Sequence, residues 1–224
     1  MAPDAILGRE AELATIARFF DDVGQGPRAL LIEGDAGIGK TTLWRESVRL
    51  AQRRGRVLIS RASDAEARLS FAVLGDVLVP ALDEGGLERL PARQRRSLEA
   101  ALMLGEPAGS RPDSRAVALA VLEVLRSLAA EDPLTLAIDD VQWVDGPSAR
   151  AFAFALRRFV DEPITVVAAR RMASGVLDSA GPGRVAPGRR RSAHHRSDRS
   201  GSARTIAPSA AGPRLRSPPR ATDP

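Results

Sequence analysis

The stretch Gly34-Asp-Ala-Gly-Ile-Gly-Lys-Thr-Thr42 matches the pattern G-x-x-x-x-G-K-[ST], which defines a phosphate-binding P-loop. Glycine at positions 34, 37 and 39 lets the backbone curl, so that several N–H groups can converge on one anion. Residues 28–33 are apolar and predict a strand, and residues 41–54 predict a helix whose amino end faces the same anion. The stretch therefore predicts a P-loop between a strand and a helix.

This loop contains most of the predicted nucleotide-binding residues, namely Gly34, Asp35, Ala36, Gly37, Ile38, Gly39, Lys40, Thr41 and Thr42. Lys40 is expected to reach the β- and γ-phosphates and to act in catalysis, and the Thr41 hydroxyl is expected to ligate Mg²⁺. Lys40 is the only lysine among the 33 basic residues. A lysine at this position suits a site that requires a compact ammonium rather than a planar guanidinium.

Length and composition restrict the class of protein. A chain of 224 residues can form one α/β domain with a sizeable core. It has no cysteine, which excludes disulfides, thiol chemistry and cysteine metal ligands. No signal peptide and no apolar run approaching 18 residues is present. We therefore expect a soluble, cytoplasmic protein without a membrane partner.

The apolar periodicity predicts an α/β fold, a P-loop NTPase three-layer sandwich with a mostly parallel sheet. Four core strands are expected, and a fifth is missing; the predicted strands are residues 28–33, 56–61, 134–138 and 164–169. Residues 62–112 contain two predicted helices, 71–82 and 91–104, and form a helical insertion without recognisable chemistry. The ATPase domain is expected to span residues 1–171.

The second predicted half of the site follows the strand 134–138, which has the form of a Walker B element. Asp139 is expected to hold Mg²⁺, and Asp140 to orient or deprotonate the attacking water. Because ligands of open α/β sheets bind at the carboxyl ends of strands, both motifs should meet in one crevice. Arg170, at another strand end, is either a γ-phosphate contact or a solvated arginine.

Three segments together resemble a known family: Leu7-Gly-Arg-Glu-Ala-Glu-Leu13, the P-loop, and Ile138-Asp-Asp-Val-Gln-Trp-Val-Asp145. They are similar to the AAA-related STAND-class ATPase module of the large ATP-dependent LuxR-type bacterial transcriptional regulators. The resemblance implies ATP binding with Mg²⁺, slow hydrolysis used as a conformational switch, and self-association through ATPase domains. It places Leu7, Gly8 and Arg9 near the adenine and assigns γ-phosphate sensing to Arg170. Trp143 is expected to pack beneath the Walker B loop.

The sequence also departs from that family. The lid, the winged helix, the repeat region and the DNA-binding helix-turn-helix of such regulators are not visible in it. A guanine-recognition motif needs a second lysine, so a GTPase is excluded. Two further hypotheses stay open. The chain is another kind of P-loop ATPase or kinase, or it is a truncated remnant that binds nucleotide weakly or not at all.

Residues 172–224 differ in composition from the rest of the chain. They contain ten arginines and three aspartates, whereas residues 1–171 contain 23 basic and 25 acidic side chains. With few large apolar residues, this tail cannot bury enough surface to form a core, and we expect it to be disordered. It is either a native basic tail or an out-of-frame sequence that replaces the fifth strand.

Overall fold

The computed structural model describes residues 8–22, 26–82, 87–104, 111–171 and 184–185. In chain order, its elements are α1 (Glu10–Asp21), β1 (Arg28–Gly34), α2 (Lys40–Ala51), β2 (Arg56–Arg61), α3 (Ala72–Leu78), the 3₁₀ helix η1 (Val79–Ala81), α4 (Ala92–Ala101), α5 (Ser114–Glu131), β3 (Leu134–Asp139), the 3₁₀ helix η2 (Val141–Trp143), α6 (Gly146–Leu156), β4 (Ile164–Arg171) and β5 (Arg184–Val185). None of the helices described is long and apolar enough to cross a membrane.

The strands form one sheet in the order β2-β3-β4-β1-β5, and every pair of neighbours is parallel. The prediction that a fifth strand is missing is wrong, because Arg184–Val185 pair with Leu31 and Ile32 of β1. Two residues can pair through their backbone alone, which leaves no apolar run to detect in the sequence. The remainder of the tail predicted to be disordered, residues 172–183 and 186–224, lies outside the described residues.

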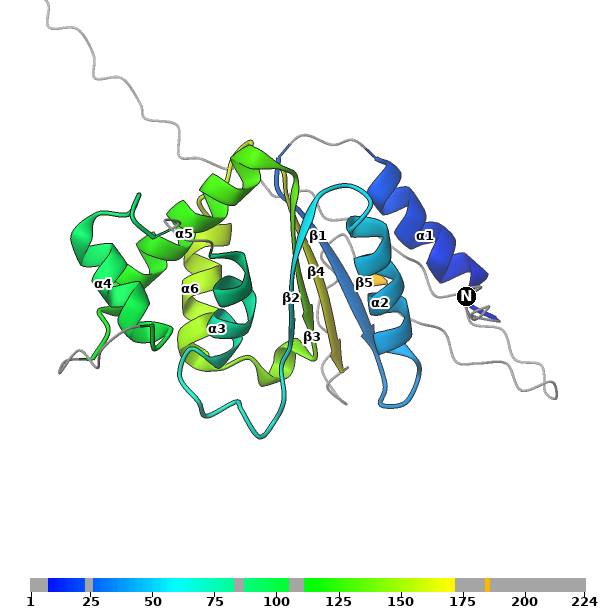
Figure 1. Cartoon of the computed structure of the whole chain (residues 1–224). Helices are drawn as coiled ribbons and strands as arrows, with labels where there is room; N and C mark the ends of the chain where they lie inside the picture. The colour runs from blue at the N-terminus through cyan, green and yellow to red at the C-terminus, as the bar shows by residue number, and fades with distance from the viewer. Residues whose placement is uncertain (1–7, 23–25, 83–86, 105–110, 172–183, 186–224) are drawn as a thin grey trace, which may run out of the picture.

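Helices cover both faces of this sheet (Figure 1). Helices α1 and α2 lie against one face, and α3, α5 and α6 lie on the other, with α4 packed on the outer side of α5. The predicted three-layer α/β sandwich with a parallel sheet is thereby confirmed. Parallel pairing requires crossover connections, and the helices α2 and α5 supply them before β2 and β3.

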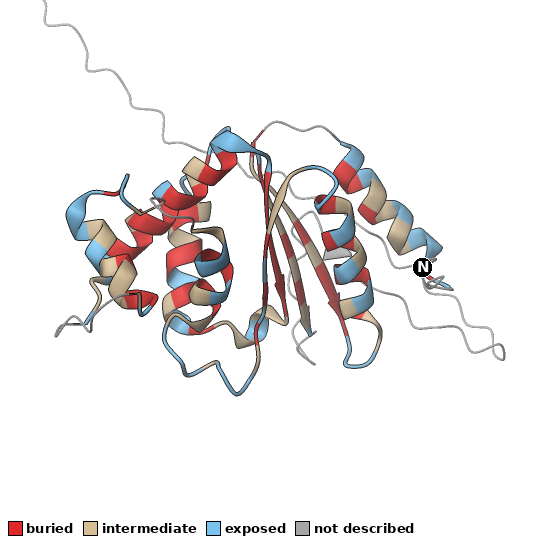
Figure 2. Cartoon of the chain, viewed as in Figure 1, coloured by how far each residue is buried: buried red, intermediate tan, exposed pale blue. Residues whose placement is uncertain are grey.

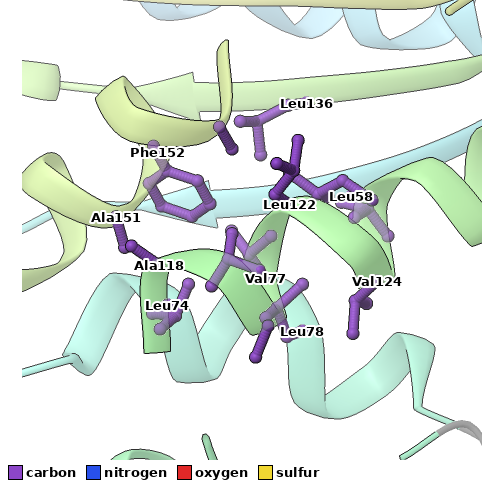
Figure 3. Close-up of a cluster of buried hydrophobic side chains, with 14 of the residues drawn as sticks. Leu58, Leu74, Val77, Leu78, Ala118, Leu122, Val124, Leu136, Ala151 and Phe152 are labelled. Atoms are coloured by element: carbon purple, nitrogen blue, oxygen red, sulfur yellow. The ribbon is translucent and has the colours of Figure 1, made fainter. Parts of the chain in front are cut away.

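Two apolar clusters fill the space between the layers. The smaller cluster joins α1 and α2 to the sheet through Ile16, Ile32 and Trp44. In the larger cluster, Leu58 and Leu136 of the sheet meet side chains of α3, α5 and α6 (Figure 3). Figure 2 shows the buried residues along the sheet and on the helix sides that face it. Every residue of β3 is buried, as expected for a central strand with helices on both faces.

The segment predicted as a helical insertion is helical, but its helices are shorter than predicted. The helix expected over residues 71–82 is α3 followed by η1, and the helix expected over 91–104 is α4. Pro80 lies in η1, where it cannot donate a backbone hydrogen bond and its ring would clash with a preceding carbonyl of an α-helix. Proline therefore ends the α-helical geometry.

One buried carboxylate joins the start of α3 to the start of α6. Asp145 is 1% exposed and caps α6 by accepting a hydrogen bond from the Ser148 amide at 2.9 Å. The same carboxylate accepts from the amides of Phe71 at 2.8 Å and Val73 at 3.2 Å. Phe71 has a positive φ of 65°, a conformation that costs free energy in a bulky residue. Asp145 thus stabilises two helix ends and one strained turn.

The substitution Asp145→Ala should lower the free energy of unfolding by roughly 2–4 kcal/mol, because it leaves several buried amides without an acceptor. Asp113→Ala is the matched control. Asp113 caps α5 from a more exposed position through the amides of Arg115 and Ala116, so its loss should cost only about 1 kcal/mol. Urea denaturation of both variants measures the difference. Equal losses would contradict the bridging role of Asp145.

Candidate functional site

The predicted site residues come together because all strands of the sheet run in the same direction. The carboxyl ends of β1, β3 and β4 therefore meet at one edge, which brings together the P-loop, the acids and Arg170. The register aligns Glu33 with Arg170 and Gly34 with Arg171 across β1 and β4. On the other side of β3, Arg61 of β2 is aligned with Asp139.

The P-loop connects β1 to α2 through two glycines in the left-handed region. Gly37 has a φ of 75° and Gly39 a φ of 92°, which non-glycine residues adopt at a cost. Lys40 begins α2 and is 7% exposed, and its ammonium donates a hydrogen bond to the carbonyl of Asp35 at 2.8 Å. The ammonium thus lies against the loop that leads into the helix. Thr41 and Thr42 follow on the first turn of α2.

Arg9 supports the P-loop from the outside. Arg9 as a whole residue is only 3% exposed. Its guanidinium donates a hydrogen bond to the carbonyl of Ile38 and forms an ion pair with Glu12 at 3.4 Å. A Cβ at Gly39 would lie 3.5 Å from the same guanidinium. Gly8 precedes it with a φ of 79°. Leu7, which we predicted near the adenine with these two residues, lies outside the described residues.

Asp139 is the most buried acid of the predicted pair, at 4% exposure. Burial raises the pKa of its carboxyl above the ordinary value of 3.8, and the charge of Asp140 raises this pKa further. A hydrogen bond from the Thr41 side chain, the Asp140 amide and the positive charge of Arg61 act in the opposite direction. The Thr41 side chain, from a segment nearly a hundred residues earlier, therefore lies close enough to the Asp139 carboxyl to influence its pKa.

Asp140 has a left-handed backbone conformation, and its carboxylate accepts a hydrogen bond. Its φ of 52° is left-handed, and its amide donates to the Asp139 carboxylate at 3.0 Å. Gln142 donates to the Asp140 carboxylate at 2.7 Å and accepts from the Arg171 amide at 3.2 Å. A carboxylate only accepts and an amide N–H only donates, so the two partners determine how the Gln142 amide is oriented. Gln142 thus ties the Asp140 loop to the end of β4.

Arg170 is paired rather than freely solvated. Its Nε donates to Glu33, a carboxylate on β1 that is 3% exposed. The Arg170 side chain itself remains 39% exposed. The structure therefore places the predicted γ-phosphate contact beside the strand that leads into the P-loop. Trp143, which we predicted to pack beneath the Walker B loop, packs against the larger apolar cluster.

Sequence reasoning missed Glu33, Gln142 and Arg61. Glu33 is the one acid in the strand before the P-loop and follows the apolar run 29–32, and this interruption was a usable signal. Gln142 lies inside the quoted Asp-Asp-Val-Gln-Trp run, but nothing in the sequence pairs it with Arg171. Arg61 is the last residue of β2, and ligands of open α/β sheets bind at the carboxyl ends of the strands.

The oxygen atoms of Thr41 and Asp139 fit a magnesium ion. Mg²⁺ prefers hard oxygen ligands and is usually held by one or two protein groups together with phosphates and water. The Thr41 hydroxyl, on the first turn of α2, lies close enough to the Asp139 carboxyl at the end of β3 to influence its pKa. Within the described ranges, no group of three or more histidine, cysteine or acidic side chains could hold a metal by itself. A magnesium ion here would therefore share its ligands with a nucleotide.

The parallel sheet, the P-loop at the end of β1 and the acid at the end of β3 define a P-loop NTPase domain. A family model of the AAA ATPase domain matches residues 5–167. The chain belongs to this family, whose members generally bind ATP with Mg²⁺.

Two individual proteins are similar to this chain. An uncharacterised protein of Rhizobium meliloti (strain 1021) is 30% identical over 207 residues, which cover 81% of this chain and 20% of that protein. The chain therefore spans about a fifth of the length of this curated relative. The crystal structure of Cdc6p from Pyrobaculum aerophilum is similar with a TM-score of 0.46 and 17% identity, over 77% of this chain and 41% of that chain.

In magnesium-free buffer, Asp139→Asn should raise the free energy of unfolding at pH 7, because it removes a buried charge and its repulsion with Asp140. Since the folded pKa is raised, wild-type stability falls as pH increases from 3.8 through the folded pKa. The gain of the variant should be largest above the folded pKa and shrink as pH falls towards 3.8. Denaturation of the wild type and the variant at several pH values between acidic and neutral measures this difference in the free energy of unfolding.

Asp64→Asn is the control for this comparison, because Asp64 is exposed and is not one of the predicted site residues. It should leave the pH dependence of unfolding unchanged. An Asp139→Asn variant that is less stable than the wild type at every pH would show that the carboxylate stabilises the nucleotide-free fold.

Proposed function

We propose that this chain is an ATP-binding module that hydrolyses ATP slowly and acts as a conformational switch in a signal-transduction or transcriptional regulator. The observation that supports this most directly is the proximity of the Thr41 side chain to the Asp139 carboxyl at one edge of the parallel sheet. It joins the P-loop helix to the acid of β3, so that the groups for phosphate and for Mg²⁺ belong to one crevice.

The proposed roles follow from this arrangement. The P-loop amides and the amino end of α2 bind the phosphates, and Lys40 exchanges the carbonyl of Asp35 for the β- and γ-phosphates. Thr41 and Asp139 hold Mg²⁺, which would neutralise charge on the phosphates. Asp140 orients or deprotonates the attacking water, and Arg170, beside Glu33, contacts the γ-phosphate.

The regulatory part of the proposal rests on the resemblance of Leu7 to Leu13 and of Ile138 to Asp145 to the STAND-class regulators. A relative about five times longer than the matched region is consistent with an ATPase module that works within a larger protein. Self-association through ATPase domains, a cytoplasmic location and a place upstream of gene expression are parts of the same proposal. The competing hypotheses are a different P-loop ATPase or kinase and a remnant that does not bind nucleotide.

Mg-ATP should stabilise the protein against thermal unfolding, by about 2.7 kcal/mol at a concentration 100 times the Kd. Lys40→Ala should abolish this gain, because it removes the cation that binds the phosphates. The ligand-induced shift in Tm is compared within each variant, so a change in intrinsic stability does not matter.

Arg45→Ala is the matched control, since Arg45 is an exposed cation on the same helix. This variant should retain the full shift. If the wild type and Lys40→Ala melt identically with and without Mg-ATP, the chain is a remnant without a working nucleotide site.

Asp140→Asn should retain ATP binding and lose turnover, because the amide keeps the shape but cannot accept a proton. Asparagine also tolerates the left-handed backbone at this position, so the loop should remain folded. Phosphate release measures turnover, and the thermal shift measures binding. Turnover equal to that of the wild type would remove Asp140 from the catalytic role, and binding without turnover in the wild type would leave a switch that does not hydrolyse.

A further inference from the structure

Arg61 is a cation at the edge of the nucleotide crevice that the proposed function does not use. It is the last residue of β2 and is exposed, and the sheet register aligns it with Asp139 of β3. Its guanidinium lies over the ring of Trp44, 5.5 Å from the ring centre. Trp44 belongs to α2 and is 1% exposed, so Arg61 covers one side of a buried aromatic ring.

Arg61 lies on the face of the sheet that carries the P-loop helix. Side chains alternate between the two faces along a strand, so Val57 and Arg61, four residues apart, point to the same face. Val57 packs against the cluster formed by α1 and α2. The contact with Trp44 agrees with this orientation. On β3, Asp139 lies on the same face, since Ala137, two residues before it, belongs to the cluster formed by α1 and α2. The guanidinium is therefore on the face of the sheet that carries α2 and the predicted Mg²⁺ ligands, and it contacts α2 at Trp44.

The guanidinium of Arg61 makes only a weak interaction with the protein. In the described part of the chain, no carboxylate lies within ion-pair distance of its guanidinium, which contacts the aromatic face of Trp44 instead. An exposed cation–π contact is worth less than a charge-assisted hydrogen bond to a phosphate. The positive charge also acts on Asp139, which places the guanidinium within electrostatic range of the acid.

We propose that Arg61 is a further phosphate-binding residue, which leaves Trp44 and binds the terminal phosphate when Mg-ATP occupies the crevice. The inference rests on the proposed function, since it needs a nucleotide bound at the P-loop. Strand β3 lies between β2 and β4, so Arg61 approaches the phosphate from the side opposite Arg170. The proposed movement is a rotation of the side chain, because the backbone of β2 is held in register with β3.

The fluorescence of Trp44 tests the movement. The chain contains two tryptophans, so Trp143→Phe leaves Trp44 as the only one. In this background, Mg-ATP should uncover the Trp44 ring and shift its emission to longer wavelength, whereas Mg-ADP, which lacks the terminal phosphate, should leave the emission nearly unchanged. Adding Arg61→Gln should remove the response to Mg-ATP. Arg53→Gln, at an exposed arginine just beyond the carboxyl end of α2, should keep it.

Binding measurements test the contact without the tryptophan substitution. Arg61→Gln in the otherwise native chain should weaken binding of Mg-ATP about tenfold, the loss expected for one charge-assisted contact, and change binding of Mg-ADP by less than about twofold. The difference between the two nucleotides separates a phosphate contact from a loss of fold, which would weaken both.

The outcomes distinguish the two hypotheses. If Mg-ATP stabilises the protein but Trp44 emission and the affinity for Mg-ATP do not depend on Arg61, the inference about Arg61 is overturned and the proposed function stands. Equal losses of Mg-ATP and Mg-ADP binding in Arg61→Gln would also overturn it. If Mg-ATP stabilises neither the wild type nor any variant, the proposed function fails, and the role of Arg61 fails with it.

Discussion

The buried carboxylate of Asp139 is the constraint on which the candidate site depends. A charge at the end of a fully buried strand is costly unless polar groups compensate for the lost water. Here the Thr41 side chain, the Asp140 amide and the charge of Arg61 provide partial compensation, and the pKa of the carboxyl remains raised. Incomplete compensation is what a metal-binding acid requires, because the arrival of a dication then removes a penalty already present in the fold.

The other charged groups are arranged around this acid by contacts between strand ends. Glu33 holds Arg170 on one side, and Gln142 joins Asp140 to the amide of Arg171. The Asp140 loop and the carboxyl end of β4 are therefore physically linked. The proposed switch would use this link to connect the acids to the strand that carries Arg170.

The layer of helices opposite the P-loop is connected to the same region. Asp145 follows the acid pair by one short 3₁₀ helix and holds the starts of both α6 and α3. The run from Ile138 to Asp145, which suggested a particular class of regulator, thus combines the acids with the residue that secures two helices. Because the run contains both the acid pair and the residue that caps the two helices, it extends beyond the two acids.

The sequence alone determined the P-loop, the four long strands, the acid at the end of β3 and the sandwich architecture, because each depends on local pattern: glycine spacing, apolar runs and the residues that end them. The helix predicted over residues 71–82 was too long, since Pro80 ends the α-helical geometry of α3. The tertiary structure alone decided the partners of Arg170, Gln142 and Arg61, the bridging role of Asp145 and the pairing of β5. These contacts join residues far apart in the chain, and their geometry depends on the register of parallel strands, which a single sequence does not specify.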